Sequence, residues 1–494
     1  MLQHYFCCMM KKIIFTICIA STCTAAFAQE KWDLRRMVDY ATANNISVKQ
    51  ADVQARIQGL QLKQAKYNQL PSLSFNPNIG MQFGRSIDPT TNQFTTTQLL
   101  FNTYQLQGGM QLYNFGQIKS NIAFNALNVQ AALADKAKVA NDIALSVCNF
   151  YLQVLASREQ VKINELQIAS TLQQLAVTKK RVDAGSLPEL NNAEIEAQLA
   201  NDSSNLVSAK AILAQNLISL KGFLNIDMET PFDVEMPAIT KIPVENLVDL
   251  NAAVVYQLAM SNQPQQLADS FRIAAAKMAL KSTKASLYPA LTMGYSLGTN
   301  FSNAVKAIDP TSVTITGTEF TSQFVNINNQ PVFVQQPKIQ FRQYNRNFSQ
   351  LWQGYGSQLD NNFRQSLSFG INVPIFNSTN NVRIGIERSK IDIENSQLLR
   401  KQNSLKLQQD IYNAYVAAEA AMQKFYASDK SVISAQKAYD FAKKRYEVGL
   451  LPTLDLITNQ NNLLRAKIQQ LNNQFDYVFK MKMLEFYKGQ GLKL

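Results

Sequence analysis

The feature that most constrains this chain is a short segment that occurs twice and interrupts a very long helical pattern each time. The first copy, residues 179–190, reads KKRVDAGSLPEL, and the second, residues 443–454, reads KKRYEVGLLPTL. The shared residues recur at one constant offset, which indicates an internal duplication. In each copy a glycine, Gly185 or Gly449, stands where a helix would end in a left-handed cap. Pro188 or Pro452 follows where the next helix would begin. Each half therefore predicts a helical hairpin with a tight tip.

The helices before the tips carry apolar residues at every seventh position. Backwards from Val182 this seam comprises Leu175, Ile168, Val161, Val154, Val147, Ala140, Leu133 and Ala126. Backwards from Tyr446 it comprises Tyr439, Val432, Phe425, Ala418 and Ile411. Spacing of seven over such a length indicates coiled-coil packing. The helix before the first tip should run for about 68 residues, or roughly 100 Å.

The N-terminus has the pattern of a signal peptide over residues 1–28. Lys11 and Lys12 precede an apolar run from Ile13 to Ile19, and Ala26-Phe27-Ala28 forms a small-residue cleavage site. We therefore expect the mature chain to be exported. Processing would remove the only histidine, His4, and every cysteine except Cys148.

The mature chain then lacks the side chains that most catalytic and metal sites use. Without histidine and with a single thiol, it cannot form a zinc site of the usual kind, a Ser-His-Asp triad or a Cys-His pair. We expect no enzyme, no metal and no cofactor. Cys148 lies beside the seam residue Val147 and is expected to fill the core, with redox use as the alternative.

Four segments alternate between apolar and polar residues: about 72–84, 101–113, 289–301 and 364–376. A period of two predicts strands with one apolar and one polar face. Each segment is about as long as the ten or so residues that a tilted strand needs to cross a bilayer, and aromatic residues cluster near the ends. The alternative is a pair of hairpins in a soluble sandwich, since soluble sheets show the same alternation.

Long polar segments, residues 85–100 and 303–360, separate the paired strands and are expected to be outward loops of a membrane protein. No run of eighteen apolar residues occurs in the mature chain, so we expect strands rather than helices to cross a membrane. Four strands cannot close a barrel, and an open edge cannot stand in lipid. The chain is thus expected to assemble with copies of itself, three of which would supply twelve strands. The net charge of +13 is spread over helix faces and predicts solvated surface, with no nucleic acid as a partner.

Together, the duplicated halves, paired strands, long helical hairpins and glycine–proline tips resemble the TolC-like outer-membrane efflux proteins. The resemblance implies an α+β membrane protein with structural repeats at residues 29–240 and 241–494. It implies a homotrimer whose twelve-stranded β-barrel in the outer membrane of a Gram-negative bacterium continues into a periplasmic α-helical barrel. The implied function is the passive exit duct of a tripartite efflux or secretion system. Its partners would be a periplasmic adaptor, an inner-membrane pump and outer-membrane lipid.

The resemblance also implies a periplasmic gate. A tyrosine, a glycine and a gate aspartate of the family match Tyr446, Gly449 and Asp455. The family's latch arginine corresponds to Leu451, its second gate acid to Thr458, and its latch threonine and aspartate to Leu190 and Asn191. We therefore expect closure by apolar packing and one ring of Asp455 rather than by salt bridges. Asp455 has a second interpretation, because an acid in the first turn stabilises a helix by about 1 kcal/mol or less.

The tips themselves are the expected docking site for the adaptor. They comprise Gly185, Leu187 and Pro188 in the first half and Gly449, Leu450, Leu451 and Pro452 in the second. Uncovered leucines at the end of a hairpin are typical of a site that binds a partner. The alternative function is a structural coiled-coil protein of the cell envelope without a transport role. That alternative explains the heptads but not the duplicated tips or the alternating segments.

Overall fold

The computed structural model describes residues 31–87, 92–95, 99–236, 245–303, 307–328, 330–344, 352, 354–376 and 378–489. The expected signal peptide, residues 1–28, lies outside the described residues. The chain divides into two compact units. The first comprises Met1–Gln61, Asn125–Ala276 and Ile391–Leu494, and we call it the helical unit. The second comprises Leu62–Phe124 and Lys277–Lys390, and we call it the strand unit.

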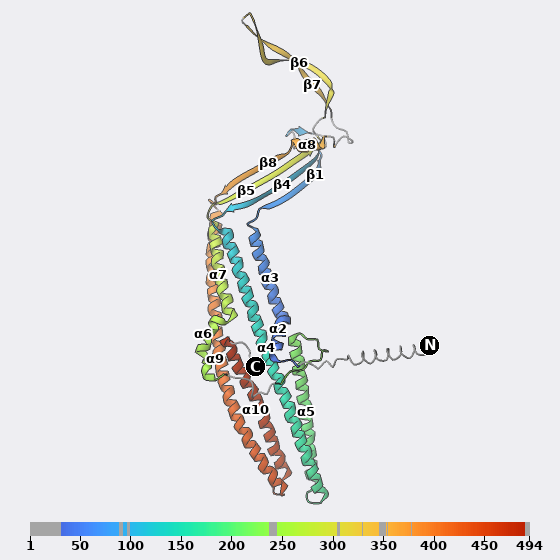
Figure 1. The fold of residues 1–494 in the computed structure, drawn as a ribbon, viewed down its shortest axis with the longest axis vertical. Helices are drawn as coiled ribbons and strands as arrows, with labels where there is room; N and C mark the ends of the chain where they lie inside the picture. The colour runs from blue at the N-terminus through green and yellow to red at the C-terminus, as the bar shows by residue number, and fades with distance from the viewer. Residues whose placement is uncertain are drawn as a thin grey trace, which may run out of the picture. The chain divides into compact units, whose positions relative to one another are not determined.

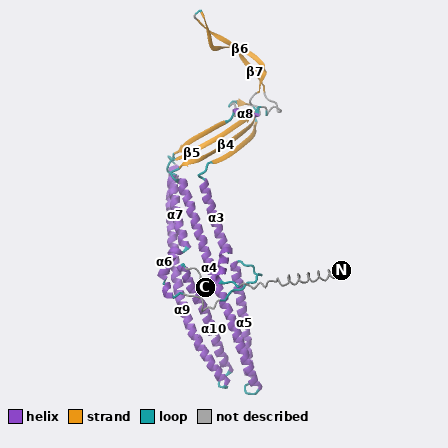
Figure 2. Ribbon diagram, viewed as in Figure 1, coloured by secondary structure: helices purple, strands orange, loops and turns teal. Residues whose placement is uncertain are grey.

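Helix lengths repeat between the two halves of the sequence. The pairs are α2 (Leu34–Asn44) and α6 (Ala252–Asn262) with 11 residues each, α3 (Ile46–Tyr67) and α7 (Pro264–Ala285) with 22 each, and α5 (Glu189–Leu224) and α10 (Thr453–Lys488) with 36 each. The longest helices, α4 (Gln117–Asp183) and α9 (Ser378–Glu447), have 67 and 70 residues. A short 3₁₀ helix, η2 (Leu247–Leu250), precedes α6. The matched lengths confirm that the fold consists of duplicated halves with long helical hairpins (Figure 2).

The helical unit contains two large apolar cores. In one, Val147, Tyr151 and Val154 of α4 pack with Met37 of α2 and Leu220 of α5. In the other, α9 contributes Ile411, Ala414 and Ala418, which pack with residues of α6 and α10 such as Val255 and Met481. The predicted seam therefore supplies residues to both cores.

The seam does not stay buried along the whole of α4. Leu133 is 45% exposed, whereas Ala131, which lies outside the predicted seam, is buried. A helix with 3.6 residues per turn drifts by about 20° per heptad relative to a strict repeat of seven, so the buried stripe moves to neighbouring positions. At Leu133 the predicted seam is therefore apolar but not buried within one copy.

Cys148 is fully buried in the core around α4. Removal from water raises the pKa of its thiol to about 12. The thiol therefore stays protonated at neutral pH and is poorly reactive, as expected of a residue that fills the core.

A four-stranded antiparallel sheet forms the centre of the strand unit, in the order β1 (Ser72–Gln82), β4 (Leu99–Tyr113), β5 (Ala290–Ser302) and β8 (Arg364–Asn372) (Figure 1). Its register places apolar side chains on one face, and several of these are more than half exposed: Leu73, Phe75, Ile79, Leu367, Phe369 and Ile371. The opposite face carries mainly serine, asparagine and glutamine. Among the described strands, β1 and β8 each pair on one side only. The sheet is therefore open, and the barrel is not closed by one copy.

The segments expected to be polar loops contain further structure. Strands β2 (Ser86–Ile87) and β3 (Phe94–Thr95) pair within the first segment. The second contains a long hairpin, β6 (Ala307–Ile327) and β7 (Gln330–Tyr344), followed by α8 (Tyr355–Asn361). The alternation in β6 was obscured because its register against β7 shifts at three places. The interpretation of residues 303–360 as a loop was therefore incomplete.

Helix α4 includes an 18-residue window with a mean hydropathy of 1.3, which is long and apolar enough to cross a membrane. In this window 39% of the residues are buried within the chain. Helices in the core of a folded protein meet the same criterion. The apolar composition of α4 is explained by its contribution of Val147, Tyr151 and Val154 to an apolar core.

Candidate functional site

Both tips adopt the turn that their glycines and prolines predict. Gly185 and Gly449 have φ angles of 69° and 77°, in the left-handed region that favours glycine. In the first tip the amide of Ser186 donates to the carbonyl of Arg181 at 2.9 Å, and in the second the amide of Leu450 donates to that of Arg445 at 2.8 Å. These bonds satisfy carbonyls at the ends of α4 and α9, and Pro188 and Pro452 precede the first residues of α5 and α10. The predicted caps are confirmed.

Exposure at the tips differs from what the sequence suggested. Leu450 is 68% exposed, but Leu187 and Leu451 are only half-exposed. Leu451 packs against a small core formed by Tyr439, Ala442, Tyr446, Leu456 and Leu463, so the expectation that it lies uncovered was wrong. Other apolar residues at the tips are more exposed, and the sequence analysis missed them as docking candidates: Leu190, Val448 and Leu454.

Tyr446 is buried and bonds to the first hairpin rather than standing free. Its hydroxyl lies 2.8 Å from Oγ1 of Thr178 on α4. Arg181 donates to the backbone carbonyl of Tyr446 at 3.2 Å and also to that of Glu447. The guanidinium carbon lies 6.0 Å from the centre of the Tyr446 ring. One residue of the second hairpin is thus held by two residues of the first.

A second tyrosine repeats the arrangement one heptad earlier. The hydroxyl of Tyr439 accepts a hydrogen bond of 3.1 Å from Nε2 of Gln174. Tyr439, Tyr446 and Gln174 line a small cavity of about 100 Å³, together with Ser170, Val177 and Leu456. The two tyrosines therefore bring aromatic rings and hydroxyl groups to the same boundary between hairpins.

Amide and hydroxyl groups continue this boundary further from the tips. Asp202 of α5 is 1% exposed and accepts bonds from Thr171 at 2.6 Å and from Gln198 at 2.8 Å. Gln460 of α10 donates to Thr171 at 3.1 Å, and Asn461 of α10 exchanges two bonds of 3.1 Å with Gln198. We call these contacts, together with those of Tyr439 and Tyr446, the polar boundary. It joins α4 and α5 to α9 and α10.

Asp455 lies exposed in the first turn of α10. Its carbonyl accepts a bond of 2.8 Å from Asn459, and Thr458 bonds back to the carbonyl of Leu454. Among the described residues, the ion pairs lie away from the two tips, as in Lys210–Glu165 and Lys136–Asp52. At the described tip residues the charged contact between the hairpins is that of Arg181 with the carbonyls of Tyr446 and Glu447, not a pair of opposite charges.

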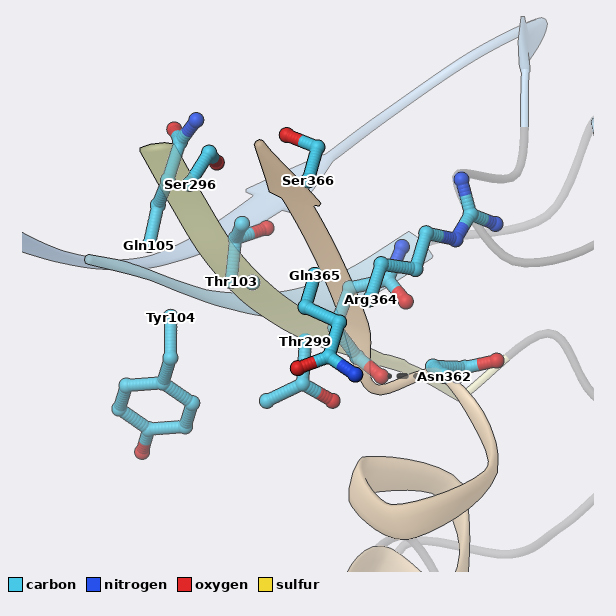
Figure 3. Close-up of a pocket in the computed structure, with 11 residues that line it drawn as sticks. Thr103, Tyr104, Gln105, Ser296, Thr299, Asn362, Arg364, Gln365 and Ser366 are labelled. Atoms are coloured by element: carbon cyan, nitrogen blue, oxygen red, sulfur yellow. Dashed lines mark hydrogen bonds between the residues drawn. The ribbon is translucent and has the colours of Figure 1, made fainter. Parts of the chain in front are cut away.

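The strand unit has a separate hollow of about 490 Å³ at the end of the sheet nearest α8. Figure 3 shows that Gln105 and Ser296 extend to one side of the strands and Tyr104 to the other. Asn362 donates a bond of 2.8 Å to the carbonyl of Asn300 at its margin. Arg364 is the only charged residue in the four strands of the sheet, and the register places it with the serines of the polar face.

Comparison with known proteins identifies this arrangement of tips, long hairpins and open sheet. The sequence model of the family described as outer membrane efflux protein matches residues 37–225 and 335–487. The chain belongs to this family. It is an outer-membrane efflux channel of an export system, located in the outer membrane of a Gram-negative bacterium, and it is not an enzyme.

Individual efflux proteins are similar to this chain over most of their length. The pyoverdine export outer membrane protein OpmQ of Pseudomonas putida is 21% identical over 452 residues, which cover 90% of this chain and 81% of OpmQ. The outer membrane efflux protein BepC of Brucella suis is 21% identical over 446 residues, covering 89% and 81%.

Solved structures of outer-membrane proteins share the fold. VceC from Vibrio cholerae has a TM-score of 0.66 at 13% identity, covering 93% of this chain and 97% of VceC. The CmeC outer membrane channel of Campylobacter jejuni has a TM-score of 0.66 at 14% identity, covering 93% and 86%. The TolC-like fold expected from the sequence is therefore confirmed, whereas the roles of individual tip residues remain predictions.

Proposed function

We propose that three copies of this efflux protein close one twelve-stranded barrel and form a passive exit duct for an inner-membrane pump and its periplasmic adaptor. The open sheet carries the proposal. Its apolar face fits contact with lipid, but its edge strands β1 and β8 have unpaired sides that cannot stand in a bilayer. Three four-stranded sheets joined edge to edge remove every free edge.

The direct test is the mass of the purified protein in mild detergent. A trimer is expected, with a step-wise conductance when it is inserted into planar bilayers. A stable monomer would contradict the proposed assembly. A trimer without conductance would contradict the duct and favour a purely structural protein of the cell envelope.

The polar boundary is the proposed gate. Its contacts connect the two hairpins of one copy, so parting the hairpins would break the bonds of Tyr446 to Thr178, of Arg181 to the backbone, and of Gln198 to Asn461. Most of these contacts join neutral groups, and salt screens neutral hydrogen bonds far less than exposed ion pairs. Gating should therefore change little with ionic strength.

The exposed apolar groups at the tips are the proposed adaptor site. Leu450 and Val448 are each 68% exposed, and both lie beside the glycine of the second tip. Leu190 and Leu454, beside the prolines, are 66% and 61% exposed. Apolar side chains concentrated at the ends of two hairpins favour a protein partner over water.

A further inference from the structure

The hairpin β6–β7 has one apolar face that no other described segment of the chain covers. Strand β7 is regular, so its odd-numbered residues share one face, and the register identifies their partners on β6. Three apolar cross-strand pairs lie on that face, and we call them the apolar strip: Val313–Phe341, Ile315–Ile339 and Phe324–Phe333. The rings of Phe324 and Phe333 meet edge to face, with centroids 6.0 Å apart.

The opposite face is polar where residues 309–319 pair with residues 336–342, whereas nearer the hairpin turn it carries the apolar pair Val325–Val332. Thr314 pairs with Gln340, and Glu319 accepts a bond of 2.9 Å from its partner Gln336. Lys338 lies between these two pairs on β7. This part of the hairpin is therefore amphipathic, with one apolar and one polar face. Near the turn both faces are apolar, because Phe324–Phe333 and Val325–Val332 are consecutive pairs.

The apolar strip is far more exposed than a stable structure tolerates. Ile315 is 65% exposed, Phe324 is 55% exposed, and even the least exposed member, Phe341, is 42% exposed. An isolated two-stranded hairpin is at best marginally stable in water and needs further strands or a helix against its apolar face. The strip thus requires a cover that is present whenever the protein is folded.

The chain connectivity indicates which cover is available. The hairpin is inserted between β5 and β8, and β8 is an edge strand of the open sheet. In the proposed trimer each β8 edge joins the sheet of a neighbouring copy, so the hairpins of three copies leave the barrel at equivalent places around one axis. In such a trimer every hairpin has the hairpins of the second and third copies as its neighbours.

We infer that the apolar strips of three copies pack against one another, with the polar faces turned to water, and form a three-sided apolar core outside the barrel. This inference rests on the trimer proposed above. It makes the hairpin an additional contact between copies, continuous with the junction of the sheets. It also accounts for the valine, isoleucine and phenylalanine residues that lie opposite the polar pairs Thr314–Gln340 and Glu319–Gln336.

Single cysteines test the inference with little disturbance of the fold. Cys148 is buried and protonated, so an introduced thiol is the reactive one in the mature chain. Ile315→Cys places the thiol on the apolar strip, and its neighbour Thr314→Cys places a matched thiol on the polar face. Ile339→Cys and Gln340→Cys form the same pair on β7.

The rate of reaction with a membrane-impermeant maleimide is measured on purified trimers in detergent and again after unfolding. We expect Ile315→Cys and Ile339→Cys to react at least tenfold more slowly in the trimer than Thr314→Cys and Gln340→Cys, and all four to react alike after unfolding. Mild oxidation should link copies through the strip thiols and not through the control thiols.

Several results would overturn the inference. Equal rates for strip and control thiols in intact trimers would show that no copy covers the strip. Protection that appears only after addition of lipopolysaccharide-containing vesicles would assign the cover to lipid. Both results leave the proposed duct standing, because trimer mass and conductance are measured on the same samples. A monomer in detergent would overturn the assembly and the inference together.

Discussion

On the first hairpin Thr171, Thr178 and Arg181 face the polar boundary, whereas on the second hairpin Tyr439, Tyr446 and Gln460 face it. The two tips have the same turn, with glycine φ angles of 69° and 77°, and the same lengths of 36 residues for the returning helices. Their side chains have become complementary instead of remaining alike. Thr178 and Gln174 bond to the two tyrosine hydroxyls, and Arg181 reaches across while its counterpart Arg445 is exposed. The two hairpins thus share a backbone conformation because of the duplication, whereas their side chains differ and form hydrogen bonds with one another.

The largest expected effect concerns docking, where the two tips differ in exposed apolar surface. Leu450→Glu puts a charge on the most exposed leucine of the second tip and should abolish export, because a carboxylate cannot be buried against an apolar partner without a large cost. Ser186→Glu adds the same charge at the equivalent position of the first tip. Export is measured as resistance of cells to a pump substrate, and trimer yield is measured in parallel. Equal loss of export in both variants would show that negative charge alone, and not the leucine, is responsible.

The next largest effect is expected from removing the buried tyrosine. Tyr446→Ala leaves a cavity in the small core of the second hairpin and removes the bond to Thr178. Together these losses should destabilise the closed state by about 3–5 kcal/mol. Conductance of the resting channel in planar bilayers should rise by an order of magnitude or more. Its counterpart Val182 is half-exposed, so Val182→Ala should raise conductance little. A resting conductance that stays at the wild-type level in Tyr446→Ala would exclude the polar boundary as the gate.

A smaller effect should follow from removing the charged contact that Arg181 makes across the boundary. Arg181→Met removes the bonds to the carbonyls of Tyr446 and Glu447. Such bonds contribute about 1.5–3 kcal/mol where they are buried, and less at this half-exposed position. We expect a several-fold rise in open probability. Arg445→Met provides the control, and an equal response to both changes would mean that Arg181 acts only through general positive charge.

The smallest effect concerns selectivity rather than opening. Both returning helices carry an acid in their first turn, Glu189 in α5 and Asp455 in α10. If three copies of Asp455 surround the axis, Asp455→Ala should lower the cation preference measured by reversal potentials in a salt gradient. Glu189→Ala should leave it unchanged. Loss of stability in Asp455→Ala without a change in selectivity would support its other role, as an acid that stabilises the start of α10.

Much of this architecture is predictable from the sequence because it depends on local rules. The turns follow from Gly185, Gly449 and the prolines, and the strands of the sheet follow from a period of two. Tyr439 and Tyr446 belong to the predicted seam, but their bonds across the polar boundary could not be predicted, because partners there lie 263 to 289 residues apart and are mostly threonine, glutamine and asparagine. Buried residues at 157, 164, 171 and 178 do repeat every seventh position, but they are polar and a search for apolar spacing passes over them.

The composition of the polar boundary has a consequence for how the channel responds to temperature. Parting the hairpins there exposes hydroxyls and amides such as Thr171 and Thr178 together with the parts of the Tyr439 and Tyr446 rings that meet α4. Heat capacity changes when apolar surface meets water, and exposed polar surface changes it in the opposite direction. The heat capacities of the closed and open states should therefore nearly match. A plot of the logarithm of the open-to-closed ratio against reciprocal temperature should then be straight over the range in which the bacterium grows, so that one enthalpy describes gating in cold and in warm surroundings.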